Sequence, residues 1–289
     1  MHQETVVHSR PDREIRKKII TPGDYTIVPY EDSRCKVVIT DVICTNEDGK
    51  IEIDPDSVAF SPSFDGNMLI GDLDNFIDKD FELLLQQMCS GETCSAIFVY
   101  RDSDKKLVKE ISCTVELKEV MEEQVISDWS WQRLYEAAVH HKEKGVLLVK
   151  DKKIVQAFRR FSKALKFLVA VEPVDPNEVD DVMMRDMKEL KVKLLSNLAH
   201  CQLQFNEYEA ALELCNRALK LEPDNIKVLY RRSLAHTGLK LFEEAWRDIQ
   251  AVLQLDPNDK AARQKANALK PIIEKINKEY ESVIKKMFV

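Results

Sequence analysis

The sequence contains little of what builds linkers, disulfide frameworks or metal sites. Its 289 residues include only 7 Gly and 10 Pro, which argues against long low-complexity segments. The 7 cysteines are an odd number, and no two of them stand in a C-x-x-C spacing, so we expect neither structural disulfides nor a zinc site. Reduced and mostly buried thiols indicate a cytoplasmic protein. We expect no metal ion and no cofactor.

Long apolar runs and catalytic motifs are also missing. No stretch approaches the roughly 20 apolar residues that a membrane span requires, and residues 1–18 carry charges where a secretory signal has its apolar core. The motifs G-x-S-x-G, H-E-x-x-H and the phosphate-binding P-loop do not occur. His140 and His141 are adjacent, so their rings diverge on a helix. We therefore expect no enzyme, and a protein that binds neither membranes nor nucleic acid.

The sequence does contain the material for two soluble domains. Hydrophobic residues make up 44% and charged residues 32% of the chain, and this length suits two domains of ordinary size. Residues 1–121 hold 14 basic and 24 acidic residues, whereas residues 122–289 hold 29 and 26, so the two halves differ in character. Residues 142–166 contain nine basic and two acidic residues, which indicates either an acidic partner or a solvated basic helix face.

A period of 34 residues marks the second half. It separates three pairs of similar residues: Ala211 and Ala245, Tyr208 and Phe242, and Pro223 and Pro257. This is the length of a tetratricopeptide repeat (TPR), a pair of antiparallel helices. In this register Leu195, Leu198 and Ala199 lie on a first helix, and small residues such as Ala199 let the second helix approach closely. Each proline ends a helix because it has no backbone donor.

An earlier copy of the repeat precedes an insertion. Its matching residues are Gly145, Ala157, Phe161 and Ala164. Ala157 lies 54 residues before Ala211, which is one period plus an insertion. The insertion falls near residues 172–191, where prolines and acidic residues predict a loop followed by an early helix start. Residues 260–288 are amphipathic and predict a helix that caps the open end. We therefore predict three repeats and a capping helix over residues 128–289.

These residues resemble the TPR domain of the large immunophilins, FKBP-type cochaperones that bind heat-shock protein 90. The motif Tyr230-Arg231-Arg232 and the long insertion after the first repeat are typical of that group. The resemblance implies a groove that holds the partner's C-terminal Met-Glu-Glu-Val-Asp peptide in a carboxylate clamp. The five clamp positions of the family, carried over one by one, fall on Lys142, Val146, Asn197, Lys227 and Arg231.

The spacing of two clamp residues supports this interpretation on physical grounds. Lys227 and Arg231 are four residues apart, so their like charges share one helix face and repel unless an anion lies between them. The amide of Asn197 can donate to a carboxylate. Val146 replaces the Asn of the family and offers the ligand no hydrogen bond, so we expect a weaker or differently selective clamp. The alternative is that these basic residues only line a solvated groove.

The first half alternates β-branched and polar residues in several stretches. This pattern predicts strands over residues 15–20, 35–42, 68–71, 93–100 and 107–120. Residues 80–88 contain helix formers after an acidic start, and Gly91 follows as a helix stop. An antiparallel sheet around one helix is an α+β domain. The predicted fold class is therefore an α+β domain followed by an all-α superhelix of repeats.

This order of elements resembles a degenerate FKBP domain over residues 14–121, of the kind found beside TPR domains. The resemblance is carried by residues 20–24, 47–50, 69–71, 84–88, 91–92 and 114–117. Active FKBP domains enclose a proline in an apolar, aromatic pocket. The pocket positions of the family fall on Ile39, Ile53, Asp54 and Phe81, and the loop that carries a second pocket tyrosine shrinks to residues 101–106. The resemblance therefore implies a domain without isomerase activity.

Three hypotheses follow from these patterns. The favoured one is a non-catalytic cochaperone that docks on heat-shock protein 90 or a related chaperone and presents an unidentified client through its first domain. A second hypothesis is an active peptidyl-prolyl isomerase whose aromatic wall is rebuilt from Phe60, Phe64, Phe76 and Phe98, although apolar residues at strand spacing more often form a core. The third is a TPR scaffold with a partner that is not a chaperone.

Overall fold

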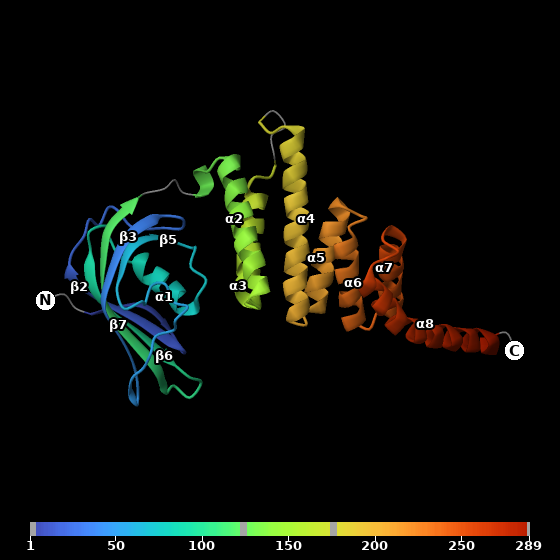
Figure 1. Ribbon diagram of the computed structural model, residues 1–289, viewed down its shortest axis with the longest axis horizontal. Helices are drawn as coiled ribbons and strands as arrows, with labels where there is room; N and C mark the ends of the chain where they lie inside the picture. Colours follow the sequence, from blue (N-terminus) through green and yellow to red (C-terminus); the bar gives the residue numbers. More distant parts are fainter. Residues whose placement is uncertain (1–3, 122–125, 174–177, 288–289) are drawn as a thin grey trace. The chain divides into compact units, whose positions relative to one another are not determined.

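The computed structural model describes residues 4–121, 126–173 and 178–287, with side chains to residue 282 (Figure 1). The chain divides into two compact units, Met1–Trp129 and Ser130–Val289. The first unit combines a β-sheet with helix α1, and the second consists of helices, so the predicted fold class is confirmed. Among the described residues, no helix is long and apolar enough to cross a membrane.

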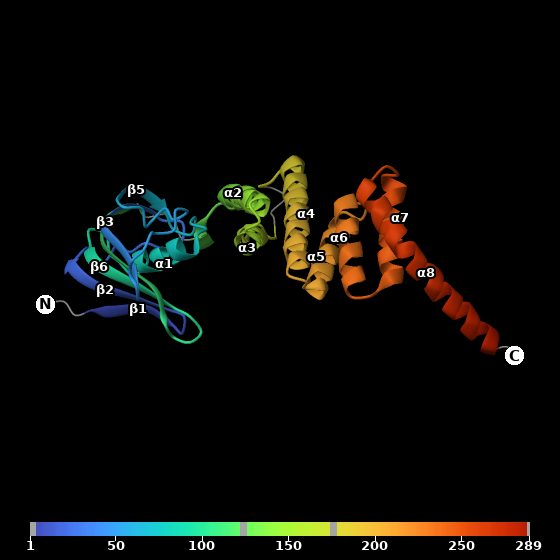
Figure 2. The ribbon, with the colours of Figure 1, turned by 60° about the horizontal axis from the view of Figure 1, so that its bottom comes forward.

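The first unit is a seven-stranded antiparallel sheet that curves around α1 (Figures 1 and 2). The strand order is β1-β2-β6-β7-β3-β4, and β5 pairs with β3 outside this path. Alternate residues of β7 are buried, because one face of the pleated strand meets the core. The elements are β1 (Thr5–Arg10), β2 (Arg13–Thr21), β3 (Arg34–Asn46), β4 (Gly49–Lys50), β5 (Phe64–Leu69), α1 (Phe76–Leu85), β6 (Thr93–Arg101), β7 (Leu107–Met121) and the 3-10 turn Ile126–Asp128.

The predicted strands and the helix have counterparts, but some of their boundaries differ. β2, β3, β6 and β7 lie where the sequence predicts them, while β5 begins at Phe64, earlier than predicted. The edge strand β1 was missed because its mostly exposed residues show no buried face and it forms by pairing with β2. α1 begins at Phe76 rather than Asp80, since the Asn75 side chain caps it and accepts from the Ile77 amide at 3.1 Å.

Two acidic residues of α1 that the sequence suggests are solvent-facing are buried, and they bind groups from other parts of the chain. Asp78 accepts from the Ser57 hydroxyl at 2.5 Å and from the backbone amides of Val58 and Ala59 at 2.9 and 3.2 Å. Asp80 pairs with Arg13 at 2.9 Å. The bonds of Asp78 satisfy a carboxylate that would otherwise be costly to bury, and the ion pair with Arg13 partly offsets the burial that raises the pKa of Asp80. The bonds of Asp78 also fix the loop that precedes β5.

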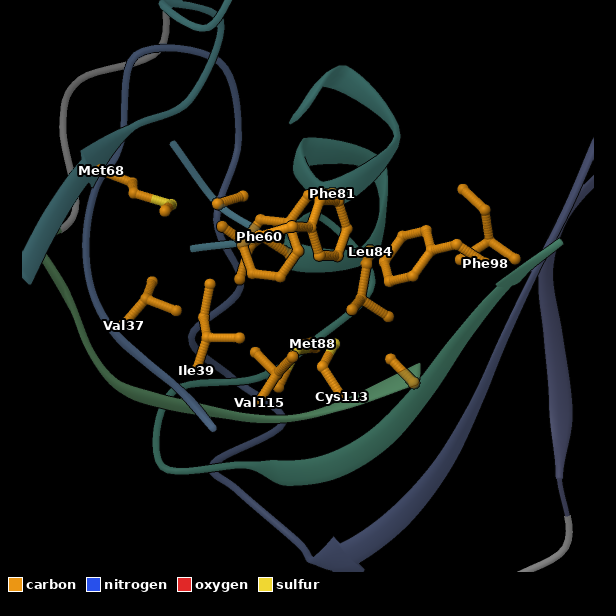
Figure 3. Packing of buried hydrophobic residues seen from close by; sticks show 14 of the residues in the cluster. Val37, Ile39, Phe60, Met68, Phe81, Leu84, Met88, Phe98, Cys113 and Val115 are labelled. Carbon is orange, nitrogen blue, oxygen red and sulfur yellow. The ribbon is translucent and has the colours of Figure 1, made fainter. Parts of the chain in front are cut away.

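That loop places Phe60 in the centre of the core (Figure 3). Its ring lies 5.6 Å from the ring of Phe81 on α1 and 4.9 Å from that of Phe98 on β6, both in edge-to-face geometry. All three side chains are at most 1% exposed. Edge-to-face packing of aromatic rings is favourable, so the space between α1 and the sheet is filled.

The second unit consists of antiparallel helix pairs stacked in sequence order (Figures 1 and 2). Each helix packs against the next one along the chain. The three pairs are α2 with α3, α4 with α5, and α6 with α7, as a TPR array requires. The helices are α2 (Trp131–Lys150), α3 (Ile154–Ala170), α4 (Asp181–Gln204), α5 (Tyr208–Leu221), α6 (Ile226–Gly238), α7 (Phe242–Leu255) and α8 (Lys260–Met287).

Small residues occur where the paired helices approach most closely. Ala157, Ala211 and Ala245, which occupy the repeat position on the second helices, are fully buried. A Cβ atom on Gly145 would lie 2.5 Å from the ring of Phe161, so α2 can contact α3 only with glycine at this position. The residues that carry the sequence repeat are therefore the packing contacts between the helices.

Asparagine and aspartate side chains cap the N-termini of helices in the second unit. Asn225 accepts from the Val228 amide at 3.0 Å and Asp259 from the Ala262 amide at 2.8 Å. The early helix start in the insertion is α4, which begins at Asp181, whereas Pro176 lies outside the described residues. The first part of α8 packs against the last repeat, with Ala262, Ala266 and Leu269 in the same buried cluster as residues of α7.

Candidate peptide-binding site

The predicted clamp residues lie on the first helix of each pair. Lys142 and Val146 are on α2, Asn197 is on α4, and Lys227 and Arg231 are on α6. α4 packs against both α2 and α6. The fold therefore places the five positions, which are far apart in the sequence, on three neighbouring helices.

Arg231 is a largely buried cation that reaches across from α6 to α4. Its Nη1 donates to the hydroxyl of Ser196. Burial lowers the pKa of Arg231 to about 10, so the guanidinium remains charged at neutral pH. Within the part of the chain that the structure describes, no carboxylate forms an ion pair with it. A buried cation whose partner is only a hydroxyl is costly, and an incoming carboxylate would relieve that cost.

Lys227 is an exposed cation one turn before Arg231 on the same face of α6. The charge of Arg231 is the main reason that the pKa of Lys227 is lowered, and partial burial adds to the effect. The two side chains therefore repel each other, as their spacing predicts. An anion bound between them would be attracted to both, which is the electrostatic arrangement that a carboxylate site needs.

Arg232, the next residue of the same motif, has a different environment. Its Nη2 lies 2.6 Å from Oδ1 of Asp248 on α7, and its Nε donates to Oδ2 of the same carboxylate at 3.0 Å. Its Nη1 donates to Asn216 on α5 at 3.1 Å. Asp248 is 4% exposed and also contacts His236 at 3.1 Å. Arg232 thus ties three helices together, whereas Arg231 contacts α4 through Ser196.

The residues from the first repeat contribute a cation and an apolar side chain. Lys142 Nζ lies 3.9 Å from Oε1 of the exposed Glu143, a contact too long and too exposed to hold the amine in place. Val146 lies one turn further along α2 and is half-buried, as is Asn197 on α4. The five predicted clamp positions therefore supply three cations and one amide, and the fifth position, Val146, offers no side-chain hydrogen bond.

Two residues of α4 beside the clamp were not identified from the sequence. Ser196 holds the Arg231 guanidinium, and His200 lies close enough to Arg231 and Lys227 for both to affect its pKa. The only signal in the sequence was position, because His200 follows Asn197 by three residues and Ser196 by four, which are helical spacings. Serine and histidine at such positions are too common to be selected without the structure.

The four predicted isomerase-pocket positions do not form one open cavity. Ile39 and Phe81 are fully buried in the core. Ile53 and Asp54 instead line a surface pocket of about 470 Å³ with Phe60 on one side. Of the aromatic residues considered for a rebuilt wall, Phe60 and Phe98 belong to the core, Phe64 packs against it, and Phe76 is 44% exposed.

The short β6–β7 connection leaves little room for a pocket wall. β6 ends at Arg101 and β7 begins at Leu107. Within the turn, Oδ1 of Asp102 accepts from the amides of Asp104 and Lys106, both at 2.9 Å. The segment is therefore a tight polar turn without an aromatic side chain, which agrees with the length expected from the sequence.

Comparison with known families assigns both units. A family model described as the BDBT FKBP-like N-terminal domain matches residues 9–122, and a tetratricopeptide-repeat model matches residues 192–225. A crystal structure of residues 1–211 of CG17282 superposes with a TM-score of 0.54 at 24% identity, covering 72% of this chain and 97% of that one. At this identity the likeness concerns the fold.

The curated relatives are longer than the regions that match. Human peptidyl-prolyl cis-trans isomerase FKBP4 is 37% identical over 122 residues, which are 42% of this chain and 26% of that protein. The Drosophila melanogaster protein Bride of doubletime is 29% identical over 190 residues, 65% of this chain and 63% of its own length. The chain thus contains a region that matches an FKBP-like N-terminal domain and a region that matches a tetratricopeptide repeat, and over part of its length it is similar to the immunophilin FKBP4.

Proposed function

We propose that this protein is a non-catalytic cochaperone whose TPR groove binds the acidic C-terminal peptide of heat-shock protein 90 or a related chaperone. The observation that carries the proposal is the pair Lys227 and Arg231, two cations on one helix face without a carboxylate partner among the described residues. Their repulsion and the burial of Arg231 are costs that a C-terminal carboxylate and an adjacent acidic side chain would offset.

The number of contacts sets the expected affinity. Each charge-assisted hydrogen bond contributes roughly 1.5–3 kcal/mol. Three cations and one amide, less the cost of ordering a flexible peptide, lead to a binding free energy on the order of −8 kcal/mol, or a Kd in the micromolar range. Because Val146 offers no hydrogen bond, we place the affinity at the weak end of that range.

Calorimetry on the full chain with the peptide Met-Glu-Glu-Val-Asp tests the proposal. We expect Lys227→Ala to weaken binding about tenfold or more, since it removes one charge-assisted contact. The matched control is Lys220→Ala, because Lys220 is an exposed lysine on α5, outside the clamp helices. A peptide with an amidated C-terminus should bind much more weakly. The clamp is refuted if the free-acid peptide does not bind, or if Lys227→Ala and Lys220→Ala bind it equally well.

We propose that the FKBP-like domain has no isomerase activity and that it presents a client protein. Supporting this, Phe60 and Phe81 pack into the core between α1 and the sheet, and the β6–β7 turn carries no aromatic side chain. A peptidyl-prolyl assay on the full chain with a Xaa-Pro peptide tests the point, and we expect no acceleration over the uncatalysed rate. Turnover comparable to that of an ordinary FKBP would establish the isomerase hypothesis instead.

The proposed partner implies a cellular compartment. All seven cysteines are free and buried, which suits the reducing conditions of the cytoplasm. We therefore propose a cytoplasmic location, where the protein would bring a client to the chaperone. If calorimetry detected no binding of an acidic chaperone peptide, the remaining hypothesis would be a TPR scaffold with a different partner.

A further inference from the structure

His200 lies beside the proposed clamp on α4. It follows Asn197 by three residues and Ser196 by four, so the His200 side chain neighbours each of them on the surface of α4. The Ser196 hydroxyl accepts a hydrogen bond from Arg231, so the His200 ring is one helical turn from the group that holds the guanidinium. His200 is half-buried and therefore remains accessible from the groove.

The charges that act on His200 come from α6. Burial, and then the charges of Arg231 and Lys227, lower the pKa of His200 below its usual value. The titratable neighbours of Arg231 on the other helices are Cys215 on α5 and Cys201 on α4. Burial raises the pKa of Cys215 to about 12 and that of Cys201 to about 11, so both thiols are neutral. Lys142 is the groove cation on α2, and α3 contacts the end of α4 through the uncharged Phe158.

We propose that His200 is a further ligand-binding residue of this groove, which supplies the hydrogen bond that Val146 cannot and takes up a proton when an acidic peptide binds. The inference rests on the proposed function, because it assumes that a carboxylate enters between α4 and α6. Neutral imidazole has one N–H donor and imidazolium has two, so protonation strengthens the contact with a carboxylate. Asn197, the predicted clamp residue on α4, would bind the same ligand from one turn earlier on the helix.

The direction of the pH dependence follows from the charges. In the free protein two cations disfavour protonated His200, whereas a bound carboxylate offsets them and raises its pKa. The complex therefore holds more protons than the separate partners. Binding and protonation promote each other by the same factor, so affinity increases as the pH falls from the pKa of the bound state towards that of the free state. The carboxylates of the peptide have pKa values near 4 and stay ionised above about pH 5.5.

Calorimetry on the full chain with Met-Glu-Glu-Val-Asp at pH 7.5 and pH 5.5 tests the proposal. We expect the wild-type protein to bind about threefold or more tightly at pH 5.5, because each unit of difference in pKa allows up to a tenfold change in affinity. Buffers with different ionisation enthalpies should reveal proton uptake on binding. His200→Gln keeps a donor and should bind without this pH dependence, while His200→Ala should bind more weakly at both pH values.

Two arms separate this inference from the clamp itself. If Lys227→Ala weakens binding but both His200 variants match the wild-type protein at each pH, the clamp stands and the role of His200 is refuted. If His200→Gln keeps the full pH dependence, another group titrates and the inference is also wrong. Absence of any peptide binding to the wild-type protein would overturn both proposals. Circular dichroism at both pH values checks that the variants are folded.

Discussion

Replacing Arg231 and Arg232 one at a time by methionine should change stability in opposite directions, although the two residues are adjacent. Methionine keeps much of the length of arginine and removes the charge. Burial lowers the pKa of Arg231 from 12.5 to about 10, and each pKa unit corresponds to roughly 1.4 kcal/mol. The charged side chain therefore costs the folded state about 3 kcal/mol at neutral pH, which lies below both pKa values and leaves the cost fully present.

The gain from Arg231→Met is smaller than this cost, since the hydrogen bond to Ser196 is lost. That bond is charge-assisted and worth roughly 1.5–3 kcal/mol, so we expect the variant to be more stable by at most about 1.5 kcal/mol and to have lost peptide binding. Arg232→Met instead leaves the buried carboxylate of Asp248 without its cation. Breaking a buried pair in this way costs about 3–5 kcal/mol.

Urea denaturation followed by circular dichroism at 222 nm measures both effects, because most of the helix belongs to the second unit. Calorimetry with the acidic peptide supplies the functional readout for Arg231→Met. If Arg231→Met unfolds at a lower urea concentration than the wild-type protein, its charge is already compensated in the fold, and the reasoning that it awaits an anion is refuted. The same conclusion follows if the variant still binds the peptide normally.

Further predictions concern packing and ionic strength. Gly145→Ala should destabilise the second unit by about 1–3 kcal/mol, since the new Cβ would lie 2.5 Å from the Phe161 ring; an unchanged urea midpoint would contradict this contact. Phe60→Ala should cost the first unit about 3–5 kcal/mol in chemical denaturation, and a loss below 1 kcal/mol would mean that Phe60 is not a core residue. Peptide affinity should fall steeply between low and physiological salt, because the cations bind largely through charge; affinity independent of salt would exclude the clamp.

Much of the second unit follows from its sequence. The 34-residue period marks close contacts between paired helices, and a close contact leaves room only for a small residue such as Ala211 or Gly145. Capping residues such as Asn225 act on amides only a few positions away. Both signals are local or strictly periodic, so they are visible without knowledge of the fold.

The first unit was harder to predict where its residues contact partners that are far away in the sequence. Asp78 and Asp80 resemble solvent-facing residues of an acidic helix start, yet they are buried because Ser57 and Arg13 reach them from other parts of the chain. The strand β1 forms by pairing with β2, not through an alternation of its own. Partners far away in the sequence leave no periodic pattern, and this is why these features were missed.

By itself the sequence determined the repeat architecture, the order of the five predicted strands and the helix in the first domain, and the residue types available to a clamp. Only the tertiary structure decided how the two arginines of one motif differ. Arg232 meets Asp248 on α7, while Arg231 meets Ser196 on α4 and finds no carboxylate within the described residues. On one helix, adjacent residues point about 100° apart, so the neighbouring helices, and not the motif, decide that one arginine is paired with a carboxylate and the other with a hydroxyl.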